Sequence, residues 1–161
     1  MKKLALIGLL ACSTATWANE EPLVVNVPRL SADVVVKIAQ GALDACRKEG
    51  IPVTATVVDR NGIAQIQLRD TTAPPVSYSI SFKKAYTAVM FNARGSELEK
   101  RWKSPLTTLD EGLAFMAGSV PIKAGGRLYG AVGVSGAPDG MVDEKCAAAG
   151  VNAVIEDLEM M

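Results

Sequence analysis

The sequence contains no histidine, and this absence excludes much of the usual chemistry of enzyme sites. A chain without histidine cannot build a Ser-His-Asp triad, a Cys-His nucleophilic pair or a histidine-based zinc site. The three cysteines are too few for a four-cysteine metal site. We therefore expect no histidine-based catalytic constellation, and whether the protein is an enzyme stays open at this stage.

The glycines near the C-terminus do not form a nucleotide-binding motif. Gly130, Gly133 and Gly136 are not followed by the Gly-Lys-Ser/Thr sequence of a phosphate-binding loop, and the strand-to-helix context is wrong. We interpret these glycines as positions of strand twist and close packing.

The first 18 residues have the pattern of a secretory signal peptide. Lys2 and Lys3 form a basic start, residues 4–11 an apolar segment, and residues 16–18 an acceptable cleavage site. The apolar segment is shorter than the roughly 20 residues that span a bilayer, so we expect no membrane span. The pattern predicts export to the periplasm. A lipoprotein anchored at Cys12 is the alternative, which a bulky leucine close to the cysteine disfavours.

The remaining chain is long enough for one domain. We interpret residues 19–30 as an extended N-terminal arm and residues 31–161 as a single folded domain. The whole chain balances 17 basic against 17 acidic residues, and loss of two lysines with the signal leaves a net charge of 15 − 17 = −2. No basic block remains that could bind a nucleic-acid backbone, so we expect no nucleic-acid partner.

Two cysteines remain after loss of the signal, an even number in an oxidising compartment. Cys46 ends an apolar stripe with helical spacing, and Cys146 lies one turn inside the last predicted helix. If these helices pack antiparallel, the two residues meet, and a bond between them would stabilise the fold by up to about 4.7 kcal/mol in the entropic description. Two buried free thiols are the alternative, and both interpretations stay open.

Periodicity and turn residues predict an α+β fold, with an antiparallel sheet and helices mainly on one face. Tight turns are expected at Asn61-Gly62 and Gly125-Gly126, and a helix start at Asp139 or Asp143. The predicted strands are residues 53–58, 63–68, 120–122 and 127–135. The predicted helices follow Ser31, cover residues 76–92, include one or two short turns within 95–113, and close the chain.

Two of these elements indicate close packing on a further surface. The helix at 76–92 is apolar on two sides, so we expect it to lie between the sheet and either another layer or a second copy of the chain. In the last strand, Tyr129, Ala131, Gly133 and Ser135 are predicted to share one face. Most of these side chains are small, so a helix or a ligand could approach the backbone there.

Several sequence blocks in order resemble the GlcG/HbpS-like haem-degrading domain family, which also supplies the C-terminal part of PduO-type cobalamin adenosyltransferases. The blocks are ALDACRKEG, VTATVVDRNG, FKKAYTAVMF and VPIKAGGRLYGAVGVSGAPDGMVDEKCAAAG. The resemblance implies a five-stranded sheet backed by helices and assembly into homo-oligomers. It also implies haem as the cofactor or ligand, with some members degrading or sensing it.

The chain departs from this family at one position that matters for haem. Similar exported sequences carry a His-Thr pair before the middle helix, and the pair falls here on Val76 and Ser77. Valine cannot coordinate iron, so haem would need a Tyr, Met or Lys ligand, or the hydroxyl of Ser77 or Thr87. Binding through apolar contact and through basic groups on the propionates is the alternative.

Four residues are candidates for the ligand-binding site: Arg69, Ser77, Lys84 and Tyr86. Lys84 borders an apolar stripe, where an ammonium group needs a carboxylate partner or an anionic ligand. It could equally reach water or pair with an acid such as Asp59. Arg69 has a guanidinium fork suited to a carboxylate, which Asp70 could also fill. Tyr86 could be a core residue instead of a ligand contact.

The sequence therefore predicts a periplasmic, oligomeric protein that binds haem or a related tetrapyrrole through an anionic part of the ligand. Oxidative breakdown of haem, in which the bound iron does most of the chemistry, is a second hypothesis, and haem sensing a third. A module that binds a small carboxylate metabolite or a partner protein, without haem, is the alternative from another class.

Overall fold

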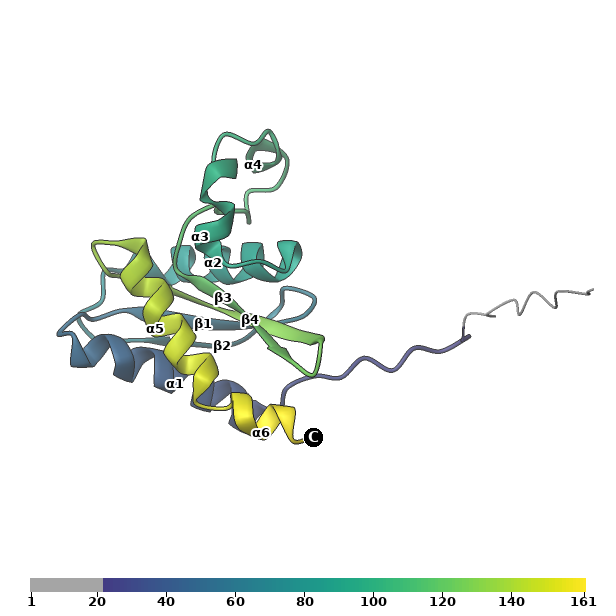
Figure 1. The fold of residues 1–161 in the computed structure, drawn as a ribbon. Helices are drawn as coiled ribbons and strands as arrows, with labels where there is room; N and C mark the ends of the chain where they lie inside the picture. The colour runs from purple at the N-terminus through teal and green to yellow at the C-terminus, as the bar shows by residue number, and fades with distance from the viewer. Residues whose placement is uncertain (1–21) are drawn as a thin grey trace, which may run out of the picture.

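The computed structural model describes residues 22–161, which form four strands and several helices (Figure 1). The predicted signal peptide, Cys12 and the first residues of the arm lie outside the described residues. All four predicted strands and the three long helices are confirmed. The elements are α1 (Ala32–Lys48), β1 (Thr54–Asp59), β2 (Ala64–Arg69), α2 (Ser77–Phe91), α3 (Gly95–Leu98), the 3₁₀ turn η1 (Glu99–Arg101), α4 (Leu106–Leu109), β3 (Ser119–Ala124), β4 (Arg127–Ser135), α5 (Gly140–Asn152) and α6 (Ile155–Glu159).

The sheet has four antiparallel strands in the order β2-β1-β4-β3, so the expected number of five is wrong for the described chain. The arm at residues 22–31 adds no strand to either edge. Side chains hold it instead, since Arg29 pairs with Asp59 and Gln65 Nε2 donates to Leu30 O at 3.1 Å. Pro28 has no N–H to donate to a strand ladder, which is a physical reason for the missing fifth strand.

Helices cover both faces of the sheet, which corrects the expectation that they lie mainly on one face. In Figure 1, α1 and α5 lie on one side of the sheet and α2 lies on the other. The larger core lies on the side of α1 and α5, where buried residues include Ile38, Ala42, Val57, Val132 and Ala147. The α+β class with an antiparallel sheet holds, and the layers are helix, sheet, helix.

The bond between Cys46 and Cys146 is present and joins α1 to α5. The two Cα atoms lie 5.5 Å apart, within the usual range for a disulfide. Cys46 lies near the end of α1, and Cys146 lies in the second turn of α5. The two helices therefore meet as the bond requires, and of the two interpretations left open by the sequence the structure adopts the disulfide.

The face under α2 is joined to the helix by hydroxyl groups. Thr54 Oγ1 and Ser77 Oγ lie 2.6 Å apart, and Thr56 Oγ1 and Ser81 Oγ lie 2.7 Å apart. A Cβ added to Gly133 of β4 would overlap the backbone oxygen of Ser81. The helix therefore touches the strand backbone there, which confirms that the small residues of β4 admit a close neighbour.

Tyr129 does not share that face, contrary to the sequence prediction. The pairing of β3 with β4 shifts between Ile122 and Lys123, where Gly130 and then Leu128 are the partners. The extra residue on β4 is Tyr129, and its side chain joins the core on the side of α1 and α5. A β-bulge breaks the two-residue alternation of a strand, so the alternation alone misplaces this side chain.

Candidate functional site

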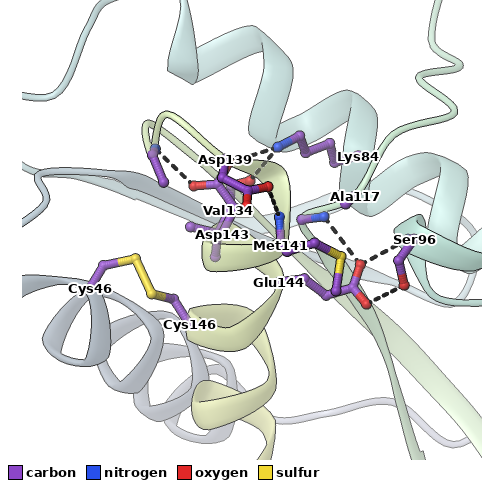
Figure 2. Close-up of polar contacts among 12 residues, drawn as sticks. Cys46, Lys84, Ser96, Ala117, Val134, Asp139, Met141, Asp143, Glu144 and Cys146 are labelled. Atoms are coloured by element: carbon purple, nitrogen blue, oxygen red, sulfur yellow. Dashed lines mark hydrogen bonds and ion pairs between the residues drawn. A yellow bond between two sulfur atoms is a disulfide. The ribbon is translucent and has the colours of Figure 1, made fainter. Parts of the chain in front are cut away.

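A buried ion pair joins α2 to the first turn of α5 (Figure 2). Lys84 Nζ donates to Asp143 Oδ2 at 2.8 Å and to the backbone oxygen of Val134 at 3.1 Å. The side chains of Lys84 and Asp143 are only 4% and 3% exposed. Burial raises the pKa of Asp143 above its ordinary value, and the nearby Lys84 charge offsets part of that increase.

The acid that neutralises Lys84 is therefore Asp143 and not Asp59. Asp59 lies at the end of β1, where its carboxylate pairs with Arg29 and accepts hydrogen bonds from the backbone of Asn61 and Ile63. Since Asp59 holds the arm and the hairpin turn, both of its oxygens are used locally. The ammonium of Lys84 has its own carboxylate inside the fold and brings little net charge to a ligand.

The acid next to Asp143 ties α5 to the segment of residues 94–118. Glu144 accepts hydrogen bonds from Ser96 N at 2.9 Å, Ser96 Oγ at 2.6 Å and Gly118 N at 3.2 Å. Gly118 has a φ of +120° and a Cβ there would lie 2.5 Å from Lys84 Nζ, so glycine is required. Asp143 and Glu144 thus fix the start of α5, which Asp139 caps by accepting from Met141 N (Figure 2).

A cleft of about 260 Å³ opens beside the ion pair. Its lining includes the apolar side chains of Ile80, Met116 and Pro138, together with Lys84 and Asp143. Ligand pockets usually have volumes of about 300–1,000 Å³. This cleft is smaller, the charges of Lys84 and Asp143 offset each other, and its remaining charged residue is the acid Glu99, so it suits a few water molecules better than a large anion.

Arg69 and Ser77 both stabilise the loop that leads into α2. Arg69 Nη1 donates to Ala73 O at 2.6 Å, and Ser77 Oγ bonds Pro74 O at 2.6 Å as well as Thr54. Asp70, the expected alternative partner of Arg69, instead accepts from Arg47 Nε at 2.9 Å. Ser77 is buried, so its hydroxyl faces the sheet and not an open site.

Tyr86 connects α2 to the tip of the segment 94–118. Its hydroxyl donates to Asp110 Oδ2 at 3.0 Å, and its ring stacks on Phe82 with 6.1 Å between centroids. The pKa of Tyr86 is raised above its ordinary value, mainly by the hydrogen bond to Asp110 and to a smaller extent by partial burial. Thr87 is also occupied, since its hydroxyl accepts from Ala114 N at 2.7 Å.

The structure thus gives each of the four predicted site residues a separate partner. No hydrogen bond within residues 22–161 joins any two of Arg69, Ser77, Lys84 and Tyr86. Of the four, only Lys84 lines the 260 Å³ cleft. Their joint role in binding a ligand stays a prediction.

A larger groove, of about 660 Å³, lies at the opposite end of the sheet and is called here the arm groove. Its walls come from the N-terminal arm, the turn after β1 and the turn before β4. The lining residues are Asn26, Val27, Pro28, Arg60, Gly126, Arg127 and Leu128. It combines apolar side chains with two guanidinium groups, a composition suited to an apolar molecule that carries carboxylates.

Strand pairing brings the two arginines of the arm groove together. Asp59 of β1 lies opposite Gly130 of β4, so the end of β1 and the start of β4 are at the same end of the sheet. Arg60 follows Asp59 directly, and Arg127 begins β4. Neither guanidinium forms an ion pair with another residue of the described chain. The sequence reasoning missed both, although the two tight turns beside them were visible.

The structure defines a small α+β domain in which helices cover both faces of an antiparallel sheet. The chain belongs to the HbpS-like family of haem-degrading proteins, whose pattern matches residues 30–152. No curated protein is similar enough to count as a match.

Solved structures agree with this assignment. HbpS is 39% identical, with a TM-score of 0.76 over 82% of this chain and 94% of its own. A double mutant of HbpS from Streptomyces reticuli is 38% identical, with a TM-score of 0.77 over 88% of this chain and 98% of its own. A complex of PduOC with haem is 24% identical, with a TM-score of 0.73 over 78% of this chain and 95% of its own. At this identity, the similarity to the PduOC complex shows a shared fold.

The side chains present fit the carboxylates of haem better than its iron. Arg60 and Arg127 could bind two propionates, and Val27, Pro28 and Leu128 offer apolar contact to a ring. The usual protein ligands of haem iron are histidine, cysteine thiolate, methionine and tyrosine. The chain has no histidine, the two described cysteines are bonded to each other, and none of the other ligand types lines the arm groove.

Proposed function

We propose that this protein binds haem or a closely related tetrapyrrole in the arm groove. Membership of the HbpS-like family supports the proposal, as does the existence of a PduOC complex with haem. The observation that carries it is the groove itself, with about 660 Å³ of space and two guanidinium groups. This volume lies within the range of about 300–1,000 Å³ that is common for ligand pockets.

The residues of the groove would bind the ligand by two kinds of contact, charged and apolar. Arg60 and Arg127 would hold the two propionates, while Val27, Pro28 and Leu128 would pack on the ring. When bound, haem iron would supply the redox chemistry of any degradation, since no protein group in the groove can do so. The protein's own part is to bind and orient the ligand.

We also propose that the protein is exported and self-associates. The N-terminal pattern and the bond between Cys46 and Cys146 favour an oxidising compartment. Val76, just before α2, and Tyr78 and Met90 within α2 are 61%, 57% and 42% exposed, and such apolar exposure suits an interface with a second copy. Within residues 22–161, no helix is both long and apolar enough to cross a membrane. Cell fractionation and light scattering of the purified protein test both proposals; a cytosolic protein or a monomer would contradict them.

Titration with hemin tests the proposed function. The purified protein should give a saturable change in the Soret band, and Lys37→Gln, which removes an exposed charge on α1, should bind equally well. An absorbance that rises linearly with hemin, as it does in buffer, would exclude specific binding. Loss of the Soret band with peroxide or a reductant, accompanied by iron release, would separate degradation from binding alone.

A haem-free function is the second candidate, and the same two arginines favour it. A guanidinium binds any carboxylate in a similar way, so a small dicarboxylate could occupy the arm groove. Thermal-shift measurements with organic acids beside hemin distinguish the two. A ligand at 100 times its dissociation constant adds roughly 2.7 kcal/mol to the free energy of unfolding.

A further inference from the structure

We infer that the arm groove recognises a tetrapyrrole by its carboxylates and not by its metal, so that metal-free protoporphyrin binds this protein about as tightly as hemin. This inference rests on the proposed function and goes beyond it. The groove presents the guanidinium groups of Arg60 and Arg127 from two hairpin turns at one end of the sheet. Its other lining side chains are the amide of Asn26 and three apolar groups.

Several side chains elsewhere that could ligate iron already have partners inside the fold. Lys84 is paired with Asp143, the Tyr86 hydroxyl donates to Asp110, and Cys46 is bonded to Cys146. Each contact would have to break before the side chain could reach a metal. Breaking the buried pair in particular would leave an uncompensated charge, which is strongly unfavourable.

Met90 is a possible iron ligand that lies beside the turn carrying Arg60, and it provides one alternative. Tyr129 and Met161 line a neighbouring pocket together with Arg127, so they provide two others. A Cβ added to Gly62 would lie 2.8 Å from Met90 Cε, so this methyl group packs beside the turn that carries Arg60. Met90 does not line the groove. Iron ligation by Met90 would make hemin bind more tightly than the metal-free ring, whereas carboxylate recognition would not.

The placement of the two cations also makes binding sensitive to salt. Arg60 and Arg127 are both exposed, so their attraction for carboxylates is screened within a Debye length of about 8 Å at physiological ionic strength. Exposed ion pairs contribute modestly, and loss of one guanidinium should weaken binding by about threefold to fivefold. The two variants together should weaken it by roughly tenfold or more if each arginine holds its own propionate.

The test compares hemin with metal-free protoporphyrin, following quenching of the intrinsic fluorescence of the purified protein for both. The variants are Arg60→Gln, Arg127→Gln and the double variant. Lys37→Gln is the control, because it removes one positive charge as each single arginine variant does, and Met90→Leu tests iron ligation. We expect the two dissociation constants to agree within about threefold. Each arginine variant should weaken both ligands by the same factor, and Met90→Leu should change neither. Hemin dimethyl ester, in which both carboxylates are blocked, should bind much more weakly than hemin.

Several outcomes overturn the inference while leaving the proposed function intact. Hemin binding at least about tenfold more tightly than protoporphyrin, or a loss of hemin binding alone in Met90→Leu, would show recognition through iron. Arginine variants that bind as well as Lys37→Gln would place the ligand outside the arm groove. If neither hemin nor protoporphyrin binds the unaltered protein, the proposed function itself fails. Circular dichroism of each variant establishes that it is folded.

Discussion

Replacing Lys84 with methionine removes the positive charge from the buried pair between α2 and α5. The Asp143 carboxylate, 3% exposed, would keep a hydrogen bond from Ala137 N at 3.0 Å but lose its only ion-pair partner within the described chain. Removing one member of a buried ion pair typically lowers the free energy of unfolding by about 3–5 kcal/mol. We expect a loss in this range for Lys84→Met, measured by urea denaturation.

A double variant separates the charge from the packing. Asp143→Asn removes the negative charge but keeps an oxygen that can accept from Ala137 N. Combined with Lys84→Met it leaves neither charge buried, so the double variant should be more stable than Lys84→Met alone by about 2 kcal/mol. The sum of the losses in the two single variants should therefore exceed the loss in the double variant by more than about 1 kcal/mol.

The pH dependence of Lys84→Met provides a second readout. Burial already raises the pKa of Asp143, and loss of the Lys84 charge should raise that pKa further. Asp143 of the folded variant then takes up a proton more readily than in the unfolded chain, so the contribution of this group to stability is greatest at low pH and falls as the pH rises through its pKa in the folded state. The loss relative to the unaltered protein should be smaller at about pH 5 than at about pH 7.5. Additive single losses that do not change with pH would refute this account of the pair.

Three other contacts give simpler predictions. Cys146→Ser, or reduction of the bond to Cys46, should lower the free energy of unfolding by up to about 4.7 kcal/mol, as measured by denaturation with and without dithiothreitol. Tyr86→Phe should cost about 0.5–1.5 kcal/mol through loss of the hydrogen bond to Asp110 and should speed proteolysis of residues 94–118; equal cleavage rates would contradict that role. Gly133→Val should prevent stable folding because its side chain would overlap the backbone of α2, and a normal melting temperature would exclude that close contact.

The strands and their turns could be predicted because their signals are local, and the sequence raised the disulfide as one of two open interpretations. Asn61-Gly62 and Gly125-Gly126 mark tight turns by backbone conformation, and glycines at 62, 125 and 126 do have positive φ angles. The pairing of Cys46 with Cys146 needed only two helices in antiparallel contact. These features depend on neighbours in the sequence or on the count of cysteines that remain once the predicted signal peptide is set aside.

The position of α2 could not be predicted from its apolar residues. The helix meets the sheet partly through Ser77 and Ser81, which bond Thr54 and Thr56, and so a polar row faces inward. Hydrogen-bonded hydroxyls can be buried at little cost, but in a sequence they resemble a solvent-exposed face. The second helical layer therefore lies on a face of the sheet whose polar residues, judged from the sequence alone, resemble a solvent-exposed surface.

The two cation sites of this chain illustrate why the candidate site was hard to locate from sequence. Lys84 is a candidate in the sequence because an ammonium beside apolar residues needs a counter-charge. In the structure this counter-charge is Asp143, 59 positions along the chain. Arg60 and Arg127 need no counter-charge, because they lie at exposed turns where water solvates them. Their charges remain available for a ligand for that reason, and the antiparallel pairing of β1 with β4 gathers them at one groove. In a chain of this kind, the cation whose burial most demands a partner is the one least free to bind an anion from outside.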